Sequence, residues 1–599
     1  MSLVTSRDIA KLLHLEKTGI FGRAVGYLIM HLLRLPAINK VYDRNKHKQG
    51  SEFFAGLLED FNYRYEISEE DLKRIPREGA FITVSNHPLG GADGILLLKI
   101  MTDIRPDFKI TGNFLLHKIK PIAPYVIAVN PFENLKGVAK RMGGAERSLE
   151  HLAQGKPLGF FPAGEVSTQK KGNIYVDREW SRGAIRIIQK SGVPVIPVYF
   201  HTKNSKWFYL LAKISGLFRT AKLPSELLNK DKRPIRIRIG KPISPKEIQK
   251  YDDVIALREF LRKKTYLLAH SYDTGNNHPI QKVKKTLKVK RKPKTIVAPK
   301  NVKYLEEEIS RLNEQGACLL NVNNYYVYFA SADKMPNVLH EIGRLREITF
   351  RQVGEGTGKS IDLDKFDKHY HHLFLWDDKE KRIAGAYRMG LGGKIFPKYG
   401  VKGFYITTLF RFEPELYGML SKSIEMGRAF IIPEYQQKPM PLFLLWKGIV
   451  HVTLRHPEHE YLIGGVSISN QFSNFSKSLM IEFMKSHYYD PFVAQYIHPK
   501  KEYKVRLKDA DRDFVFDFAQ SDLSKLDKII NEIEPQGLRI PVLIKKYIKQ
   551  NSKIIAFNVD PKFNDAIDGL MYIRIADLPD STVKPVLEEY QKELLDKMK

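Results

Sequence analysis

VSNHPLGGADG, residues 84–94, is the stretch that decides the fold of the first half of this chain. β-prone residues precede it and an apolar run, 95–98, follows it, so the pattern is strand, glycine turn and helix. In α/β proteins this pattern places the turn at the carboxyl end of a sheet, where binding sites lie. A carboxylate beside a histidine fixes its tautomer and stabilises the imidazolium, so His87 and Asp93 form a candidate general-base pair. A purely structural His-Pro turn is the alternative.

Short β-rich runs alternate with helical patterns between residues 79 and 245. This alternation predicts an α/β domain with a largely parallel sheet. Two apolar stretches with basic neighbours, 25–38 and 207–218, are typical either of membrane-surface helices or of ordinary buried helices. The expected strands span 80–85, 125–129, 158–161, 195–201 and 235–239.

The composition favours an anionic partner. The 599 residues include 98 Lys+Arg against 67 Asp+Glu, a formal net charge of +31. Such an excess suits an anionic membrane surface, an acidic protein or nucleic acid. The length predicts at least two domains, the single Cys318 excludes an intrachain disulfide, and no apolar run is long enough to predict a spanning helix.

A basic segment, 276–301, separates the two halves. Its core, 278–300, carries nine Lys/Arg and no acidic residue, which predicts an extended, solvated linker. No aromatic residues are interleaved for stacking, so nucleic-acid binding is disfavoured. The segment 302–599 mixes helices with hairpin patterns and predicts a second, mixed α/β domain.

Three further stretches extend the opening one: VNPFENLKG (129–137), GFFPAGEVS (159–167) and VPVIPVYF (193–200). With VSNHPLGGADG they resemble, in order and spacing, the four sequence blocks of the glycerol-phosphate and lysophospholipid acyltransferase family. The resemblance covers about residues 75–245. It implies that His87 deprotonates the acceptor hydroxyl and that Asp93 orients His87. It also implies substrate-binding roles for Asn86, Gly164, Glu165 and Ser167.

This chain departs from that family pattern at three points. Five residues rather than four separate His87 from Asp93, and the paired glycines between them are expected to absorb the extra one. The third block reads Phe-Pro-Ala-Gly-Glu, so its carboxylate, Glu165, stands two places later than usual. The second block lacks its usual arginine, which favours an acceptor without a phosphate. The basic residues that follow it are Lys136, Lys140 and Arg141.

In the second half, basic and acidic clusters alternate through LREITFRQ (345–352), DLDKFDKHYHHL (362–373), AGAYRMG (384–390) and IEMGRAFI (424–431). These strings resemble the GNAT-related N-acyltransferases that use acyl carrier protein, namely autoinducer synthases and ornithine-lipid N-acyltransferases. The resemblance implies that Glu425 is the base. An alternative is that Glu425, Arg388 and Arg428 form a structural ion-pair network. The implied substrate-binding residues are Arg346, Phe350, Asp364, Asp367, Arg388 and Arg428.

The loop that cradles coenzyme A phosphates in ordinary GNAT proteins is not visible, which favours a donor carried on acidic acyl carrier protein over free acyl-CoA. A late string, GLRIPVLIKKY (537–547), resembles the tail of hemolysin-labelled members of the same group.

The fusion of the two halves resembles bifunctional synthases of bacterial ornithine or glycine lipids. It implies that the second half N-acylates an amino acid with a 3-hydroxyacyl chain, and that the first half O-acylates the resulting lyso-lipid. The expected setting is peripheral, on the anionic cytoplasmic side of the inner membrane, with acyl carrier protein as partner and no bound cofactor or metal. The alternative is a lysophospholipid acyltransferase whose second half docks acyl carrier protein.

The predicted division of the chain has four parts. Residues 1–75 are a helical membrane-associating segment, 76–275 the O-acyltransferase-like domain, 276–301 the linker, and 302–599 the GNAT-like domain with a C-terminal extension.

Overall fold

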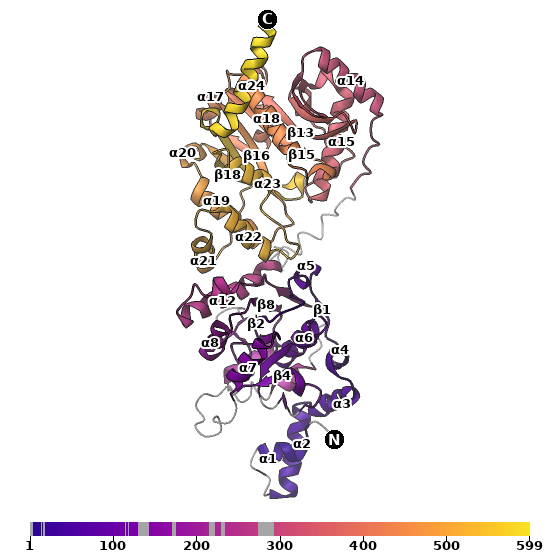
Figure 1. Ribbon diagram of the computed structural model, residues 1–599, viewed down its shortest axis with the longest axis vertical. Helices are drawn as coiled ribbons and strands as arrows, with labels where there is room; N and C mark the ends of the chain where they lie inside the picture. The colour runs from indigo at the N-terminus through magenta and orange to yellow at the C-terminus, as the bar shows by residue number, and fades with distance from the viewer. Residues whose placement is uncertain are drawn as a thin grey trace. The chain divides into compact units, whose positions relative to one another are not determined.

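The computed structural model shows two compact units (Figure 1). The first unit comprises Met1–Tyr272 and Asn531–Gly537, and the second comprises Asp273–Ile530 and Leu538–Lys599. The structure describes residues 4–12, 15, 18–113, 116–117, 119–129, 143–169, 175–214, 222–228, 234–272 and 293–598.

One short segment corrects the predicted continuity of residues 302–599. Asn531–Gly537 groups with the first unit, where the Arg238 side chain donates to the carbonyl oxygen of Glu532 at 3.1 Å. Arg238 is fully buried, so its guanidinium must find acceptors inside the protein, and these include the Asp71 carboxylate at 2.6 Å and backbone carbonyls of this segment.

The first unit contains a seven-stranded sheet of order β1-β9-β8-β2-β5-β3-β4. All neighbouring pairs are parallel except β8–β9, as the alternating sequence pattern predicts. Every residue of the central strand β2 is buried. The strands are β1 (Tyr65–Glu66), β2 (Ile82–Ser85), β3 (Lys109–Gly112), β4 (Val126–Ala128), β5 (Leu158–Phe160), β8 (Val195–His201) and β9 (Ile235–Ile239).

Helices cover this sheet, and one of them comes from the segment predicted to be separate. Helix α4 (Gly50–Asp60) inserts Phe53 and Phe54 into the same core as Leu96 of α6. The domain therefore begins well before residue 76. Phe53 and Phe54 are buried in its core, whereas a detached helix would leave these apolar side chains exposed to water. The other long helices of this unit are α6 (Gly91–Thr102), α7 (Gly144–Ala153), α8 (Arg182–Ser191), α9 (Lys206–Ile214) and α12 (Val254–Leu267).

The N-terminal helices are α1 (Ser6–Leu12), α2 (Ile20–Leu32) and α3 (Leu35–Asn45). The apolar stretch 25–38 is therefore not one helix. Arg34 adopts a left-handed conformation with φ of 57°, and the first turn of α3 contains a proline. Proline cannot donate a helical hydrogen bond, so it begins a new helix rather than continuing α2.

The second unit is built on an eight-stranded sheet of order β10-β11-β12-β13-β15-β16-β19-β18. Its pairs are antiparallel except β15–β16, which is parallel. The strands are β10 (Cys318–Val322), β11 (Tyr325–Ser331), β12 (His371–Asp377), β13 (Arg382–Leu391), β15 (Ser423–Ile431), β16 (Tyr461–Ile468), β18 (Lys553–Asp560) and β19 (Ala566–Arg574).

Several long helices of the second unit pack against this sheet (Figure 1). Helix α18 contacts β11, β12 and β13, whereas α15 contacts β13 and β15. The long helices are α14 (Val302–Glu314), α15 (Pro336–Gln352), α18 (Pro439–Arg455), α19 (Asn474–Tyr488), α21 (Asp509–Ala519), α22 (Leu523–Ile533) and α24 (Asp580–Met598).

The end of the predicted linker is not a free tether. The backbone N–H groups of Lys294 and Val297 donate to the carbonyl oxygens of Gly358 and Ser360, at 3.0 and 3.1 Å. Residues 293–300 thus lie along the second unit, while 273–292 fall outside the described residues. In the described part of the chain no helix is long and apolar enough to cross a membrane.

Candidate active sites

His87 lies in the turn between β2 and α6, and Asp93 lies in the first turn of α6. The His87 Nδ1 atom is 3.3 Å from Asp93 Oδ2. Asp93 is fully buried, and its Oδ2 also accepts the backbone N–H groups of Leu89 (2.7 Å) and Gly90 (3.0 Å). Burial raises the pKa of Asp93, while the contact with His87 opposes that shift. The carboxylate is therefore fixed from three sides before any substrate arrives.

The extra residue between the two side chains is accommodated at Gly90. This residue has a φ of +82°, which an L side chain rarely adopts. A Cβ there would lie 3.2 Å from side-chain atoms of both Leu223 and Val166. The turn closes tightly enough that His87 and Asp93 remain in contact despite the longer spacing.

The other first-half site residues act as supports. Asn86 is buried and bridges to Phe200, donating to its carbonyl at 3.1 Å and accepting its N–H at 2.7 Å. Ser167 is buried as well, and its hydroxyl donates to Asp177 Oδ1 at 2.5 Å. The Ser167 backbone N–H donates to the His87 carbonyl at 2.8 Å. These groups join the ends of β2, β8 and the third block.

Glu165 and Gly164 lie on the exposed side of the third block. Gly164 has a φ of +65°, and Glu165 forms a partly exposed ion pair with Arg178 at 3.3 Å. The predicted basic residues of the second block lie outside the described residues, and these are Lys136, Lys140 and Arg141.

Sequence reasoning missed Asp177, which follows the short strand β7 (Tyr175–Val176). It is 1% exposed and contacts both the His87 turn and Ser167. No motif contained it, and the only available signal was an acidic residue directly after a β-prone pair.

In the second unit, Glu425 of β15 is 2% exposed and accepts three hydrogen bonds. The Tyr370 hydroxyl donates to Oε2 at 2.5 Å, and the backbone N–H groups of Tyr405 and Ile406 donate to Oε2 and Oε1, both at 3.0 Å. Burial raises the pKa of Glu425 to about 7, against these donors. A carboxylate that titrates near neutral pH suits a general base. Oε1 accepts one bond here and has capacity for a second.

Two arginines of the second unit, Arg346 and Arg388, are buried in ion pairs. Arg346 of α15 donates to Asp367 at 2.8 Å, and Arg388 of β13 donates to Asp364 at 2.8 Å and lies 3.3 Å from Asp367. Burial raises the pKa of Asp367, but the two guanidinium groups outweigh it and hold this pKa below its ordinary value. Among the described residues, Nε and Nη2 of Arg388 have no hydrogen-bond partner.

Arg428 joins the same cluster of ion pairs. Its guanidinium lies 3.1 Å from Asp362 and 3.5 Å from Asp364. The same group stands over the rings of Tyr405 (4.6 Å) and Phe563 (4.4 Å). The alternating charges of the sequence are therefore an ion-pair network for the arginines and aspartates. Glu425 is held differently, by a phenol and two backbone amides.

The sheet opens at this network. β15 and β16 pair from Ser423↔Tyr461 to Met426↔Gly464, and no pair between them follows in the described chain although both strands continue. Arg428 lies just beyond the last pair with a φ of 51°. Phe350 of α15 reaches the same region, with its ring centroid 6.3 Å from that of Phe563. The predicted residues thus converge where the two strands separate.

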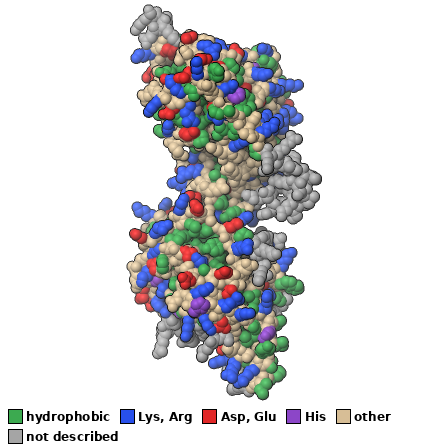
Figure 2. Space-filling view, turned by 90° about the vertical axis from the view of Figure 1, so that its right-hand side faces the viewer, with side chains coloured by type: hydrophobic (Ala, Val, Ile, Leu, Met, Phe, Trp, Pro, Cys, Tyr) green, Lys and Arg blue, Asp and Glu red, His purple; other side chains and the backbone are tan. Residues whose placement is uncertain are grey.

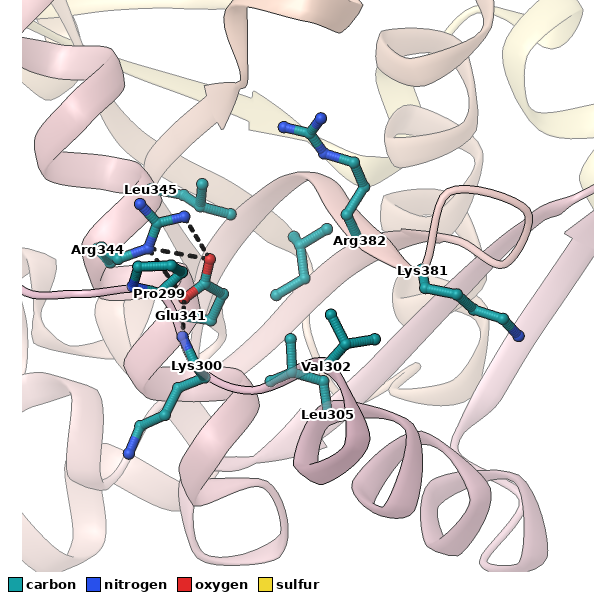
Figure 3. A pocket seen from close by; sticks show the side chains of 10 residues that line it. Pro299, Lys300, Val302, Leu305, Glu341, Arg344, Leu345, Lys381 and Arg382 are labelled. Atoms are coloured by element: carbon teal, nitrogen blue, oxygen red, sulfur yellow. Dashed lines mark hydrogen bonds and ion pairs between the residues drawn. The ribbon is translucent and has the colours of Figure 1, made fainter.

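A cavity of about 150 Å³ lies elsewhere in the second unit (Figure 3). Lys300, α14, α15 and the β12–β13 turn line it, and Figure 3 shows Glu341 paired with Arg344 at its wall. None of the predicted site residues lines this cavity. Among the described residues no group of three or more His, Cys, Asp or Glu could hold a metal ion.

Two family models match this chain, and each match contains one of the two candidate sites. Residues 23–275 match the family model described as "Acyltransferase", and residues 345–446 match the model described as "Acetyltransferase (GNAT) domain". The first range contains His87 and Asp93, and the second contains Glu425 and the arginine network. The chain is thus an enzyme that carries O- and N-acyltransferase domains in one polypeptide.

Curated relatives match each activity separately. A glycine N(alpha)-acyltransferase of Bacteroides thetaiotaomicron is 28% identical over 47% of this chain and 86% of its own length. The corresponding enzyme of Phocaeicola vulgatus is 27% identical over 51% of this chain and 96% of its own. A lyso-glycine lipid O-acyltransferase of P. vulgatus is 28% identical over 44% of this chain and 94% of its own.

Two solved structures are similar to parts of the chain. A 1-acyl-sn-glycerophosphate acyltransferase from Thermotoga maritima is 17% identical, with a TM-score of 0.24, over 40% of this chain and 86% of its own. A CoA-dependent acyl-homoserine lactone synthase is 8% identical, with a TM-score of 0.23, over 44% of this chain and 89% of its own.

Proposed function

We propose that this chain makes a diacylated glycine lipid in two steps. The second half transfers a 3-hydroxyacyl group to the amine of glycine, and the first half esterifies the new hydroxyl. The observation that carries the proposal is the pairing of relatives, because one is named for acylating glycine and the other for acylating a lyso-glycine lipid. The product of the first reaction is the substrate of the second, so their fusion in one chain is chemically sensible.

We assign the first step to the cluster around Glu425. The glycine amine attacks the thioester carbonyl, a C–N bond forms, the C–S bond breaks, and the thiol leaves. The attacking nitrogen must lose a proton, which Glu425 accepts directly or through one water. The pKa of about 7 supports this role, because a carboxylate with an ordinary pKa would be a weaker base. The neighbouring arginines, neutralised by aspartates, supply a fixed polar surface for the substrate.

We assign the second step to His87 and Asp93. The hydroxyl of the N-acylated glycine attacks a second thioester, and its proton passes to the His87 imidazole. The imidazolium is stabilised by Asp93, 3.3 Å away, and the proton is returned to the leaving thiol.

We propose acyl carrier protein as the donor for the first step, with acyl-CoA or acyl carrier protein serving the second. The formal net charge of +31 supports a strongly acidic docking partner, because opposite charges steer association. Ornithine remains the competing amino acid, although the relatives favour glycine.

We further propose that the protein works at the cytoplasmic face of the inner membrane, anchored by α2. One face of this helix exposes Ile20, Phe21, Leu28 and Leu32, with Ile20 87% and Leu32 78% exposed. Figure 2 shows hydrophobic side chains beside basic ones at this end of the first unit. Apolar and basic groups side by side suit an anionic bilayer surface, where the lyso-lipid and the product reside.

Purified full-length protein tests the proposal directly. It is incubated with 3-hydroxyacyl-acyl carrier protein and glycine, ornithine or lysophosphatidate, and the lipids are identified by mass spectrometry. N-acylated glycine, followed by its O-acylated form, is expected. Consumption of lysophosphatidate without acylation of either amino acid would replace the proposal with a phospholipid-remodelling activity.

A further inference from the structure

Asp177 joins the His87 turn to the loop of the third block. Its Oδ1 accepts the backbone N–H of His87 at 3.1 Å and the Ser167 hydroxyl at 2.5 Å. Its Oδ2 accepts the indole N–H of Trp180 at 3.3 Å. At 1% exposure this carboxylate is inaccessible to solvent, so these donors replace the water that would otherwise solvate its charge.

Helix α12 holds the backbone of Asp177 through two hydrogen bonds. The Asp177 backbone N–H donates to the Tyr266 hydroxyl at 2.7 Å, and its carbonyl accepts from Arg262 at 3.0 Å. The position of the carboxylate is therefore set by the rigid helix rather than by the loop on which it lies. Through Asp177, α12 determines where the backbone of His87 sits.

The position of the His87 backbone matters because a small displacement would separate the His87 and Asp93 side chains. The His87 Nδ1 to Asp93 Oδ2 distance of 3.3 Å is an ion-pair contact that lies just beyond the usual N–H···O hydrogen-bond range. A further shift of His87 would break the contact. The His87 ring also lies against Phe161, with centroids 4.3 Å apart, so backbone and ring must be placed together.

We propose that Asp177 is a positioning residue for O-acyl transfer. It holds His87 so that one ring nitrogen meets Asp93 and the other remains for the acceptor hydroxyl. The buried carboxylate that contacts the third block is thus Asp177, which lies outside that block, whereas Glu165 within it is at the surface with its side chain 42% exposed. This inference rests on the proposed role of His87 in O-acylation.

The test compares Asp177→Ala and Asp177→Asn in the full-length enzyme. O-acyl transfer to N-acylated glycine gives kcat and KM, and N-acyl transfer in the same sample is the internal reference. Asp177→Ala is expected to lower the O-acylation kcat about 100-fold, the size expected for a small displacement of a reacting group, with KM changed less than about threefold. Asp177→Asn keeps an oxygen acceptor for the His87 N–H and should recover most of the loss.

The matched control is Glu179→Ala, which removes an exposed carboxylate from the same loop and should leave both activities unchanged. In the Asp177→Ala background, Ser167→Ala should add no further loss, because the two residues act through one shared bond. A wild-type kcat in Asp177→Ala, or a raised KM with kcat unchanged, overturns the inference. If Asp177→Ala loses both activities through unfolding, an Asp177→Asn variant with full N-acylation but no recovered O-acylation overturns it. Absent O-acylation by the wild type would instead count against the proposed function.

Discussion

The pKa of Glu425 makes a quantitative prediction about N-acyl transfer. Burial raises this pKa to about 7, and the base must be ionised to accept the proton of the amine. At pH 6 about a tenth of the carboxyl groups are ionised, and at pH 8 about nine tenths, for a pKa near 7. The ionised fraction rises from about 0.09 to about 0.91, so the kcat for N-acylation should rise about tenfold between pH 6 and pH 8, with its midpoint near pH 7.

The assay must use kcat at saturating glycine, because kcat reports groups in the bound complex whereas kcat/KM also reports ionisation of the free amine. Glu425→Gln should lower kcat by about 10²- to 10⁴-fold, the usual contribution of a general base, and should remove the rise near pH 7. O-acylation of supplied lyso-lipid by the same sample controls for unfolding. A flat wild-type profile, or the same midpoint in Glu425→Gln, would refute the assignment.

Three further predictions follow from packing and charge. Gly90→Ala should lower the unfolding temperature and O-acylation, because a Cβ meets two side chains at 3.2 Å in a left-handed backbone. Gly91→Ala, in which the added Cβ would lie 3.6 Å from its nearest neighbour, should be tolerated. Equal melting temperatures for Gly90→Ala and Gly91→Ala would contradict this prediction. Asp367→Asn should lower the free energy of unfolding in denaturant by about 3–5 kcal/mol, because it leaves the buried Arg346 without its carboxylate. The control Asp565→Asn, which breaks an exposed ion pair with Lys501, should lower it by less than about 1 kcal/mol. The double substitution Leu28→Asp and Leu32→Asp should reduce sedimentation with anionic vesicles, whereas Val542→Asp, also at an exposed apolar residue, should not.

Local sequence signals predicted most of the fold. The strands Val195–His201 and Ile235–Ile239 lie where the pattern placed them. Each is a strongly periodic run bounded by turn residues, and such runs specify their own structure.

The elements that sequence reasoning missed depend on distant partners. The strand β1 has only two residues and exists because Tyr65 and Glu66 pair with β9, far along the chain. The hairpin of β18 and β19 completes the second sheet, because β19 pairs with β16. No local sequence pattern in that stretch predicted this pairing. Partner choice of this kind is decided by packing rather than by propensity.

The sequence likewise identified some features of the candidate sites and missed others. The blocks identified His87 and Asp93, and the structure brings their side chains into contact. The blocks could not show that Ser167 is bonded to Asp177, or that Glu425 is held by Tyr370 rather than by the arginines. Those partnerships join residues that lie 10 and 55 positions apart in the chain, so only the fold reveals them.

The order of the two steps is the central claim, and lipid analysis tests it most directly. Wild-type protein, His87→Ala and Glu425→Ala are expressed in bacteria that lack amino-acid lipids, and total lipids are measured by mass spectrometry. The account predicts diacylated glycine lipid from the wild type, mono-acylated glycine alone from His87→Ala, and neither product from Glu425→Ala. Diacylated product from either variant would contradict it.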